Sequence, residues 1–235
     1  MNGLSIGRLD YAPVSILMRV QTEHEKGFRL NACAKEPWTV GFIEGMAAGD
    51  TFYDLGANVG SYSLLAAKLG HEVVAIEPSA PSYAQLVQNC ILNGVLDRVL
   101  CVPLPVGAHI GTEWFQYRDL LPGAASHKLG AAAGGKPLWF HQQRMLSLSL
   151  DMLIAQFGLP MPTHLKIDVD GGEAGVLQGA AETLKSVQAV MLEMQIPQET
   201  ELTAIATAGG LKAKGRYAER NGKPIGNICY VWLER

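Results

Sequence analysis

The segment TFYDLGANVG, residues 51–60, constrains the fold of this chain more than any other. A short apolar run leads into Asp54, and a Gly-x-x-x-Gly turn and a helical stretch over residues 61–69 follow. The glycines let a ligand approach the backbone where a Cβ would collide with it. A second apolar run, residues 73–76, ends in Glu77. Strand, glycine turn, helix and acid-tipped strand together predict a nucleotide-binding unit.

The turn favours one class of nucleotide over another. A dinucleotide site has the pattern G-x-G-x-x-G, whose glycines make room for a pyrophosphate at the helix N-terminus. Here Asn58 stands where the second glycine would be, and Asp54 precedes Gly56. A carboxylate attracts a sulfonium or an amino group but repels a pyrophosphate. The pattern therefore favours S-adenosylmethionine over NAD, with Glu77 on the ribose; a structural turn without a ligand is the alternative.

A second segment, HLKIDVDGGE at residues 164–173, combines a strand pattern with unusual charges. Because side chains alternate along a strand, Lys166, Asp168 and Asp170 share one face. Both faces of a parallel sheet are usually covered by helices, so charges there are costly unless they are paired or used. An ion pair between Lys166 and Asp168 is the structural explanation. The position at a strand end favours function for Asp168, whereas Glu173 is also explained as a residue that stabilises its helix start.

The two segments carry a resemblance to a known family. Its motifs in this chain are Asp54-x-Gly56-Ala57-Asn58-x-Gly60, Ile76-Glu77-Pro78, Asn89 through Asn93-Gly94, Leu148-x-Leu150-Asp151, Lys166-Ile167-Asp168-Val169-Asp170-Gly171-x-Glu173, Val176-Leu177-x-Gly179-Ala180 and Leu192-Glu193. Over roughly residues 36–195 the chain resembles the FkbM-type S-adenosylmethionine-dependent methyltransferases. It departs from the family pattern at Asp170, where the family usually has Glu, and at Pro105, where it commonly has Ala.

The resemblance implies an α/β, Rossmann-like class I methyltransferase fold: a doubly wound, mostly parallel seven-stranded sheet with one antiparallel strand. Alternating patterns in the chain predict the same class of sheet. Strands are expected near residues 51–55, 72–76, 98–103, 164–169, 187–194, 211–217 and 226–233, and helices near 37–48, 60–69, 80–93, 149–157, 173–185 and 198–209. The short link at residues 221–224 permits only antiparallel pairing of the last two strands.

The chain divides into an N-terminal extension, residues 1–35, and a methyltransferase domain, residues 36–235. Strand-like residues at 14–20, with a turn and a partner strand at 25–30, predict a small hairpin or lid in the extension.

Residues 108–148 form an insert in the domain. Short strands are expected at 113–117 and 138–141, on either side of a small-residue stretch at 123–135. That stretch is expected to be mobile. A lid over the substrate and an ordinary surface hairpin are equally good interpretations.

The resemblance and the strand positions together give a set of candidate site residues. For the cofactor they are Asp54, Gly56, Ala57, Asn58, Gly60, Tyr62, Ser63, Glu77, Pro78 and Asp168. Tyr62 is equally well explained as a packing residue.

Deprotonation of the acceptor needs a further set of candidates. An alkyl hydroxyl is a weak acid, so a general base or a metal would help. Asp168 is the first choice, and Glu193 is expected beside it on the next strand, where the two could hold Mg²⁺. The alternative for Glu193 is neutralisation of Lys166, itself a catalytic candidate. His127 and His141, in the insert, are further candidates for the base, although a lone loop histidine is more often a surface residue.

Composition limits the setting and the partners. No apolar run approaches the roughly 20 residues of a membrane span, and the N-terminus lacks the pattern of a signal peptide. The 4 cysteines are scattered, which is typical of reduced thiols in a cytoplasmic protein. With a net charge of −3 and no basic cluster, a nucleic-acid substrate is not expected.

The leading hypothesis is an O-methyltransferase that acts on a hydroxyl of a sugar, glycan, polyketide or other secondary metabolite. The alternatives are an N- or C-methyltransferase and a catalytically silent, methyltransferase-like binding module, with a dehydrogenase a distant third. The Asn/Asp-Pro-Pro-Tyr/Phe signature of nucleobase amino-group methylation is absent, since the fourth strand continues as Asp168-Val169-Asp170-Gly171. The sequence leaves the acceptor and the oligomeric state open.

Overall fold

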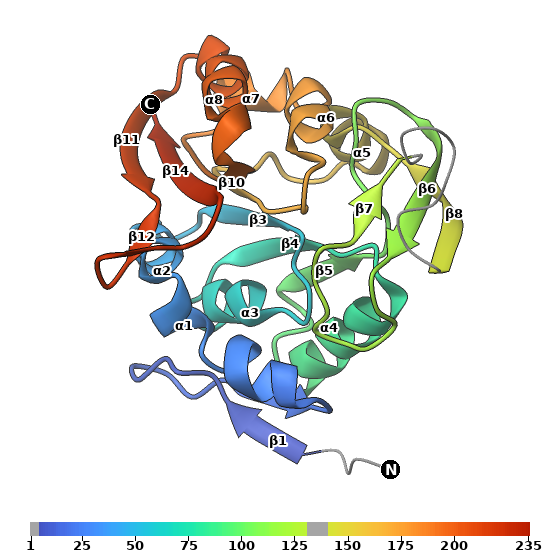
Figure 1. The fold of residues 1–235 in the computed structure, drawn as a ribbon, viewed down its shortest axis with the longest axis vertical. Coiled ribbons are helices and arrows are strands. Elements are labelled where there is room, and N and C mark those ends of the chain that lie inside the picture. The colour runs from blue at the N-terminus through green and yellow to red at the C-terminus, as the bar shows by residue number, and fades with distance from the viewer. Residues whose placement is uncertain (1–4, 131–140) are drawn as a thin grey trace.

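A computed structural model describes residues 5–130 and 141–235. Its centre is a seven-stranded sheet in the order β11-β14-β10-β9-β3-β4-β5 (Figure 1). In chain order the strands are β3 (Thr51–Leu55), β4 (Glu72–Ile76), β5 (Val99–Val102), β9 (His164–Ile167), β10 (Ala189–Gln195), β11 (Lys212–Tyr217) and β14 (Ile228–Glu234). Each of them overlaps a strand predicted from the sequence.

One strand of the sheet runs against the others. β14 pairs antiparallel with both β10 and β11, whereas the remaining neighbours pair in parallel. The predicted fold class, a mostly parallel doubly wound sheet with one antiparallel strand, is therefore confirmed. β3 lies between β4 and β9, so the chain leaves β3 on one side and returns on the other. Ligands of open α/β sheets bind outside the strand ends at this switch point.

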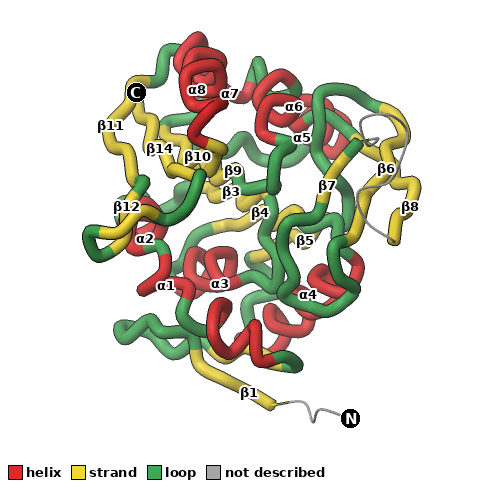
Figure 2. Tube along the Cα trace, viewed as in Figure 1, coloured by secondary structure: helices red, strands yellow, loops and turns green. Residues whose placement is uncertain are grey.

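Helices cover both faces of the sheet, as Figure 2 shows. One face carries α1 (Ala32–Lys35), α2 (Pro37–Glu44), α3 (Ser61–Lys68) and α4 (Ala80–Asn93), and the other carries α5 (Leu150–Phe157), α6 (Glu173–Gln178), α7 (Thr183–Ser186) and α8 (Glu199–Ala208). Successive residues of a strand face opposite cores, so Phe52 packs with the first group and Tyr53 with the second. A 3₁₀ turn, η3 (Ile196–Gln198), and the small pair β12 (Glu219–Arg220) and β13 (Lys223–Pro224) complete this half of the chain. Among the described residues, no helix is long and apolar enough to cross a membrane.

The region predicted as one helix at residues 173–185 is two helices, α6 and α7, so that prediction is wrong in part. The reason is a cap that the sequence pattern did not reveal. The carboxylate of Asp151 accepts hydrogen bonds from the backbone N–H groups of Glu182 and Thr183, both at 2.8 Å. This contact starts a new helix at Thr183.

The N-terminal extension is a hairpin attached to α4. β1 (Ser5–Arg8) pairs antiparallel with β2 (Leu17–Val20). Asn93 of α4 accepts a hydrogen bond from the backbone N–H of Leu17 at 2.9 Å and donates one to the carbonyl of Leu17 at 2.6 Å. Asn89 accepts from the Arg19 backbone N–H at 2.8 Å. These bonds fix the hairpin to α4 and so to the central domain.

The partner strand predicted at residues 25–30 is wrong, because the π-helix η1 (Glu25–Arg29) occupies that place. Thr22 and Glu25 bond reciprocally: the Thr22 N–H donates to the Glu25 carboxylate at 2.9 Å, and the Glu25 N–H donates to the Thr22 hydroxyl at 3.1 Å. This arrangement is a capping box, which favours a helix start over a strand.

The insert folds as a small antiparallel sheet in the order β7-β6-β8. Its strands are β6 (Gly111–Tyr117), β7 (Lys128–Leu129) and β8 (His141–Ser147). The strand predicted at 113–117 lies inside β6. The one predicted at 138–141 reaches the described residues only at His141, and the rest of it, like the end of the small-residue stretch, lies outside them.

Candidate active site

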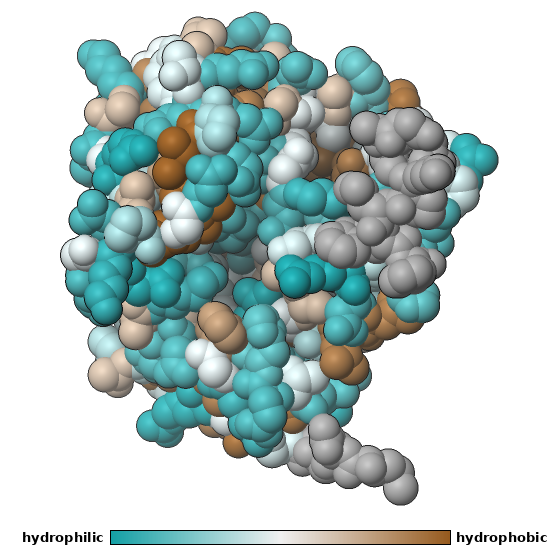
Figure 3. Space-filling view, viewed as in Figure 1, coloured by the Kyte–Doolittle hydropathy of each residue, from teal (hydrophilic) through white to brown (hydrophobic). Residues whose placement is uncertain are grey.

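The carboxyl ends of β3, β4, β9 and β10 enclose a cavity of about 170 Å³ at one edge of the sheet. In the space-filling view this face of the molecule is hollowed near its centre, among mostly hydrophilic residues (Figure 3). Of the site residues predicted from the sequence, the cavity wall contains Gly56, Asn58, Glu77, Pro78, His127, Asp168 and Glu193. Asp54, Ala57, Gly60, Tyr62, Ser63, Lys166 and His141 are not part of the wall.

The glycine turn brings the first predicted motif against the second. Gly56 has a φ of +83°, and a Cβ built there would lie 1.8 Å from the carbonyl oxygen of Asp168. The backbone N–H groups of Gly56 and Ala57 both donate to the Ile76 carbonyl at 3.0 Å. Gly60 has a φ of +95° and packs against Leu86. The turn thus needs glycine for its conformation and for its close approach to the neighbouring strand end.

Glu77 is buried at the tip of β4, with its carboxylate held by backbone donors. One oxygen accepts from the Asn58 N–H at 2.8 Å and the other from the Ser79 N–H at 2.7 Å. Burial raises the pKa of Glu77 to about 7, although these hydrogen bonds and the charge of Arg29 oppose the rise. Each carboxylate oxygen retains a lone pair, so the group can still accept hydrogen bonds from a ligand in the cavity.

Beneath the cavity lies a buried group of charges. Lys166 Nζ is 3.3 Å from Asp54 Oδ1 and 3.1 Å from Asp168 Oδ2. Ser63 donates a hydrogen bond to the other oxygen of Asp54 at 2.7 Å. Burial alone would lower the pKa of Lys166, but the charges of Asp168 and Asp54 raise it above its usual value. Asp54 therefore lies below the wall and acts on the cavity through Lys166.

Asp168 and Glu193 line the cavity side by side, with opposite electrostatics. Burial would raise the pKa of Asp168, but the charges of Lys166 and Lys35 hold it below its usual range. Burial and the charge of Asp168 raise the pKa of Glu193 well above its usual value, and its side chain bonds that of Tyr230, its partner on β14. The pKa values of the two neighbouring carboxyls are therefore shifted in opposite directions.

The pair does not fit the predicted magnesium site. Magnesium prefers several hard oxygen ligands, whereas the ammonium of Lys166 lies 3.1 Å from Asp168 and would repel a second cation. Within residues 5–130 and 141–235, no cluster of three or more His, Cys, Asp or Glu side chains is arranged to hold a metal.

The two histidines predicted as bases have different environments. His127 is buried in the cavity wall beside Phe115 and Tyr117, and burial lowers its pKa to about 4. Its Nδ1 accepts from the Arg118 backbone N–H at 3.2 Å, which puts the proton of the neutral ring on Nε2. In that tautomer His127 is a donor and not a base. His141 is exposed on β8, away from the cavity wall.

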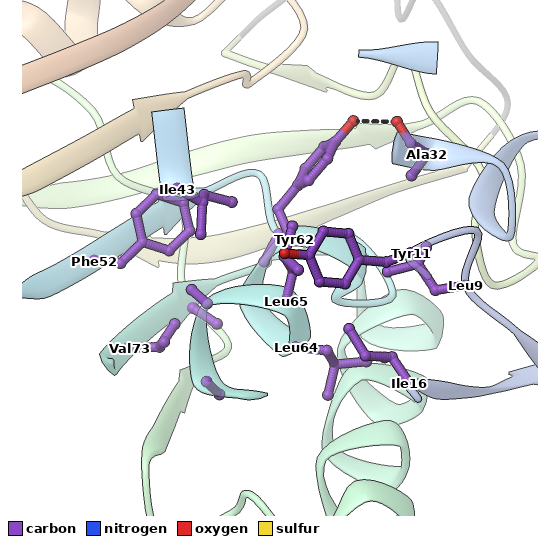
Figure 4. Packing of buried hydrophobic residues seen from close by; sticks show 14 of the residues in the cluster. Leu9, Tyr11, Ile16, Ala32, Ile43, Phe52, Tyr62, Leu64, Leu65 and Val73 are labelled. Atoms are coloured by element: carbon purple, nitrogen blue, oxygen red, sulfur yellow. Dashed lines mark hydrogen bonds between the residues drawn. The ribbon is translucent and has the colours of Figure 1, made fainter. Parts of the chain in front are cut away.

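Tyr62 is not part of the cavity wall. Its hydroxyl donates a hydrogen bond to the Ala32 carbonyl at 3.0 Å, as Figure 4 shows, and its ring lies 5.4 Å from Lys166 Nζ. It packs in the core on the α1–α4 face. The packing interpretation accounts for these contacts.

Asp170 joins the insert to the strand ends. It has a φ of +58°, and its carboxylate accepts from the Ser126 N–H at 2.6 Å. Lys128 of β7 donates to its carbonyl. The insert is therefore bonded to the segment after β9 and forms one side of the cavity.

A narrow apolar slot continues from the cavity. The two share Gly56, Pro78, Phe115 and Val169. The slot also has Ile76 and Val106 in its wall. The slot is therefore an apolar extension of the wall that contains Glu77.

Several wall residues were not predicted from the sequence. Arg29 and Lys35 come from the N-terminal extension, Phe115 from β6 and Tyr230 from β14. Tyr230 lies on the strand predicted at residues 226–233, but its place beside Glu193 was not predicted. The others depend on how the extension and the insert fold over the sheet edge.

Comparisons with known proteins agree with this geometry. A model of the methyltransferase FkbM domain matches residues 54–207. The hexuronic acid methyltransferase AglP of Haloferax volcanii is 24% identical over 155 residues, which cover 65% of this chain and 59% of AglP. A tRNA (guanine(37)-N(1))-methyltransferase of Anopheles gambiae is 35% identical over 92 residues, which cover 39% of this chain but only 14% of that enzyme.

Solved structures show the same fold at low sequence identity. TYW2 of P. horikoshii, solved with MeSAdo, has a TM-score of 0.57 and 12% identity, with 100% of this chain and 71% of that chain covered. A precorrin-6y C5,15-methyltransferase of Geobacter metallireducens has a TM-score of 0.51 and 12% identity, with 85% and 86% covered. The sheet order, the two motifs at its edge and the match over residues 54–207 lead to one conclusion: this chain belongs to the FkbM family of S-adenosylmethionine-dependent methyltransferases.

Proposed function

We propose that this chain transfers the methyl group of S-adenosylmethionine to a hydroxyl oxygen of a sugar, a glycan or another small molecule. The observation that carries the proposal is a pair of unlike carboxyls in the cavity wall. Asp168 lies 3.1 Å from the ammonium of Lys166, whose charge lowers its pKa, whereas burial and the charge of Asp168 raise the pKa of Glu193. Neighbouring acids whose pKa values are pushed apart are typical of sites with divided proton roles.

The cofactor end of the site is formed by the glycine turn, Glu77 and the apolar slot. Glu77 accepts hydrogen bonds from the ribose hydroxyls, the turn around Gly56 and Asn58 admits the methionine part, and the slot takes the adenine. Bound there, S-adenosylmethionine supplies an electrophilic methyl group whose C–S bond breaks with its electron pair left on sulfur.

Asp168 accepts the proton of the acceptor. As the new C–O bond forms, the hydroxyl oxygen gains positive charge and its proton becomes strongly acidic. A carboxylate with a low pKa is therefore a sufficient base late in the reaction, provided that it stays ionised. Lys166 keeps Asp168 in that state.

Glu193 and Tyr230 position the acceptor. The raised pKa of Glu193 favours its protonated form, which can donate one hydrogen bond while it remains bonded to Tyr230. A hydroxyl acceptor needs such an orienting partner, because alignment of the oxygen with the methyl group supplies much of the rate.

The similarity to AglP supports an acceptor of the sugar acid class. A second candidate, methylation of a tRNA guanine nitrogen, is favoured by the similarity to three tRNA (guanine(37)-N(1))-methyltransferases, although the matches cover only 14–19% of those enzymes. Secondary metabolism as the context and the cytoplasm as the location stay predictions from the sequence.

Calorimetric titration and transfer of a labelled methyl group test the proposal together. The protein should bind S-adenosylhomocysteine and not NAD⁺. With labelled S-adenosylmethionine, it should methylate a glycoside hydroxyl and not a tRNA transcript with guanine at position 37. Label in the tRNA alone would replace the proposal with the second candidate. Binding without transfer to either acceptor would favour the silent binding module.

A further inference from the structure

Arg29 stands in the cavity wall with part of its hydrogen-bonding capacity unused. It is the last residue of η1, and its Nε and Nη2 donate to the carbonyl oxygen of Gly123 in the insert, at 3.0 and 2.7 Å. Its own carbonyl accepts from the hydroxyl of Ser61, at 3.2 Å, where α3 begins. The residue is therefore fixed to the insert and to the end of the glycine turn.

The bond to Gly123 occupies one edge of the guanidinium. Of its five N–H donors, the one on Nε and one on Nη2 point to that carbonyl, so the edge formed by Nη1 and Nη2 is left. In the described part of the chain, Arg29 makes no ion pair, whereas Lys35 is 2.6 Å from Glu36 and Lys166 has two carboxylates. Arg29 is thus a positive charge at the cavity with a carbonyl, and no carboxylate, as its partner.

The field of Arg29 reaches both halves of the site. Its charge opposes the rise that burial causes in the pKa of Glu77, at the ribose end, and of Asp170, at the insert. It also acts in the same sense as Lys166 on Asp168. A guanidinium so placed favours an anion anywhere in the cavity, and the carboxyl groups of the wall are already bonded elsewhere.

We propose that the free edge of Arg29 binds a carboxylate inside the cavity. A planar guanidinium edge matches a carboxylate in a bidentate, charge-assisted pair, which an ammonium cannot reproduce. The carboxylate belongs either to the methionine part of the cofactor or to an acidic acceptor such as a hexuronic acid. The inference rests on the proposed function and adds a recognition element that the family motifs do not include.

The test compares Arg29→Gln and Arg29→Lys with the unchanged protein by calorimetry. The cofactor arm uses S-adenosylhomocysteine, which has a carboxylate, and 5′-methylthioadenosine, which lacks the amino-acid part. The acceptor arm uses phenyl glucuronide and phenyl glucoside, each titrated into the protein saturated with S-adenosylhomocysteine. Lys26→Gln is the matched control, because Lys26 lies on the same helix and is exposed, 2.6 Å from Glu23.

We expect Arg29→Gln to weaken the binding of one carboxylate-bearing probe ten- to a hundredfold and to leave the affinity for its uncharged counterpart within about twofold. Arg29→Lys should recover part of the lost affinity. A selective loss of affinity for S-adenosylhomocysteine assigns the carboxylate to the cofactor. A selective loss of affinity for phenyl glucuronide assigns it to the acceptor. An equal loss of affinity for a probe and its uncharged counterpart overturns the proposal in favour of a structural role for Arg29. Unchanged affinity for every probe overturns it as well.

Failure of the proposed function gives a different result. In that case the unchanged protein would bind neither S-adenosylhomocysteine nor 5′-methylthioadenosine. In contrast, the affinities for both compounds could stay the same after Arg29→Gln, with no selective loss of affinity for phenyl glucuronide. The protein would then have its cofactor site but no carboxylate subsite at Arg29. Lys26→Gln should match the unchanged protein in every titration, since it removes the same charge from the same helix outside the cavity.

Discussion

Gly56 and Asp168 touch through their backbones: a Cβ at residue 56 would lie 1.8 Å from the carbonyl oxygen of residue 168. The contact joins the glycine turn after β3 to the end of β9, which carries the proposed base. It explains why the two motifs occur together in this chain.

Replacement of Gly56 by Ala should therefore disrupt both the fold and the site. We expect a loss of about 4 kcal/mol or more in the free energy of unfolding, since a clash with backbone cannot be relieved by a side-chain rotation. Gly49→Ala is the matched control, because Gly49 has a φ of +90° but open space around its Cβ position. Its free energy of unfolding should fall by only about 1–2 kcal/mol, which is the cost of a left-handed conformation for a residue other than glycine. Similar losses in urea unfolding of the two variants would contradict the close contact.

The pKa of Glu77 predicts how stability depends on pH. It is about 7 in the folded protein and 4.5 without burial, so the folded state binds more protons between these values. Stability should then fall as pH rises from about 4.5 to about 7, by up to about 3 kcal/mol from this group. Glu77→Gln should remove that part of the slope, whereas the exposed Glu201→Gln on α8 should not. Parallel stability–pH curves for Glu77→Gln and the unchanged protein would disprove the shift.

The strands of the sheet could be predicted because their apolar runs are local signals. β3, β4 and β9 were expected within two residues of their ends, and the glycine turn and Glu77 were expected from their spacing. Arg29 could not be found in this way. Its place depends on the capping box at Thr22 and on a carbonyl in the insert, 94 residues further along the chain. Asp54 was expected at the ligand, but its burial under Lys166 depends on a neighbouring strand.

Lys166 holds two carboxylates together, so its removal should leave uncompensated charge in the interior. Lys166→Met should lose about 3–5 kcal/mol of stability in urea unfolding. The double variant Asp54→Asn/Lys166→Met should recover part of that loss, because a neutral amide at position 54 no longer needs a counter-charge. A Lys166→Met protein as stable as the unchanged one would mean that the triad of Asp54, Lys166 and Asp168 does not form.

Chelation should leave methyl transfer unchanged. Lys166 lies at Asp168, and the side chain of Glu193 is bonded to Tyr230, so the pair has little to offer a divalent cation. We expect the same initial rate of label transfer before and after dialysis against EDTA, and no gain on addition of Mg²⁺. A rate lost on dialysis and restored by Mg²⁺ would bring back the magnesium site predicted from the sequence.

The hairpin should support the glycine turn through Asn89 more than through Asn93. Asn89 is fully buried and joins the Arg19 N–H to the Val59 carbonyl, a residue of the turn itself, at 2.8 Å each. Among the residues that the structure describes, Asn93 bonds only Leu17 and its own helix. Each alanine variant should lose about 1–3 kcal/mol of stability, because backbone groups lose their partners. Only Asn89→Ala should also weaken S-adenosylhomocysteine binding, by roughly tenfold, since only it frees the turn. Equal affinities in both variants would show that the turn holds its shape without the hairpin.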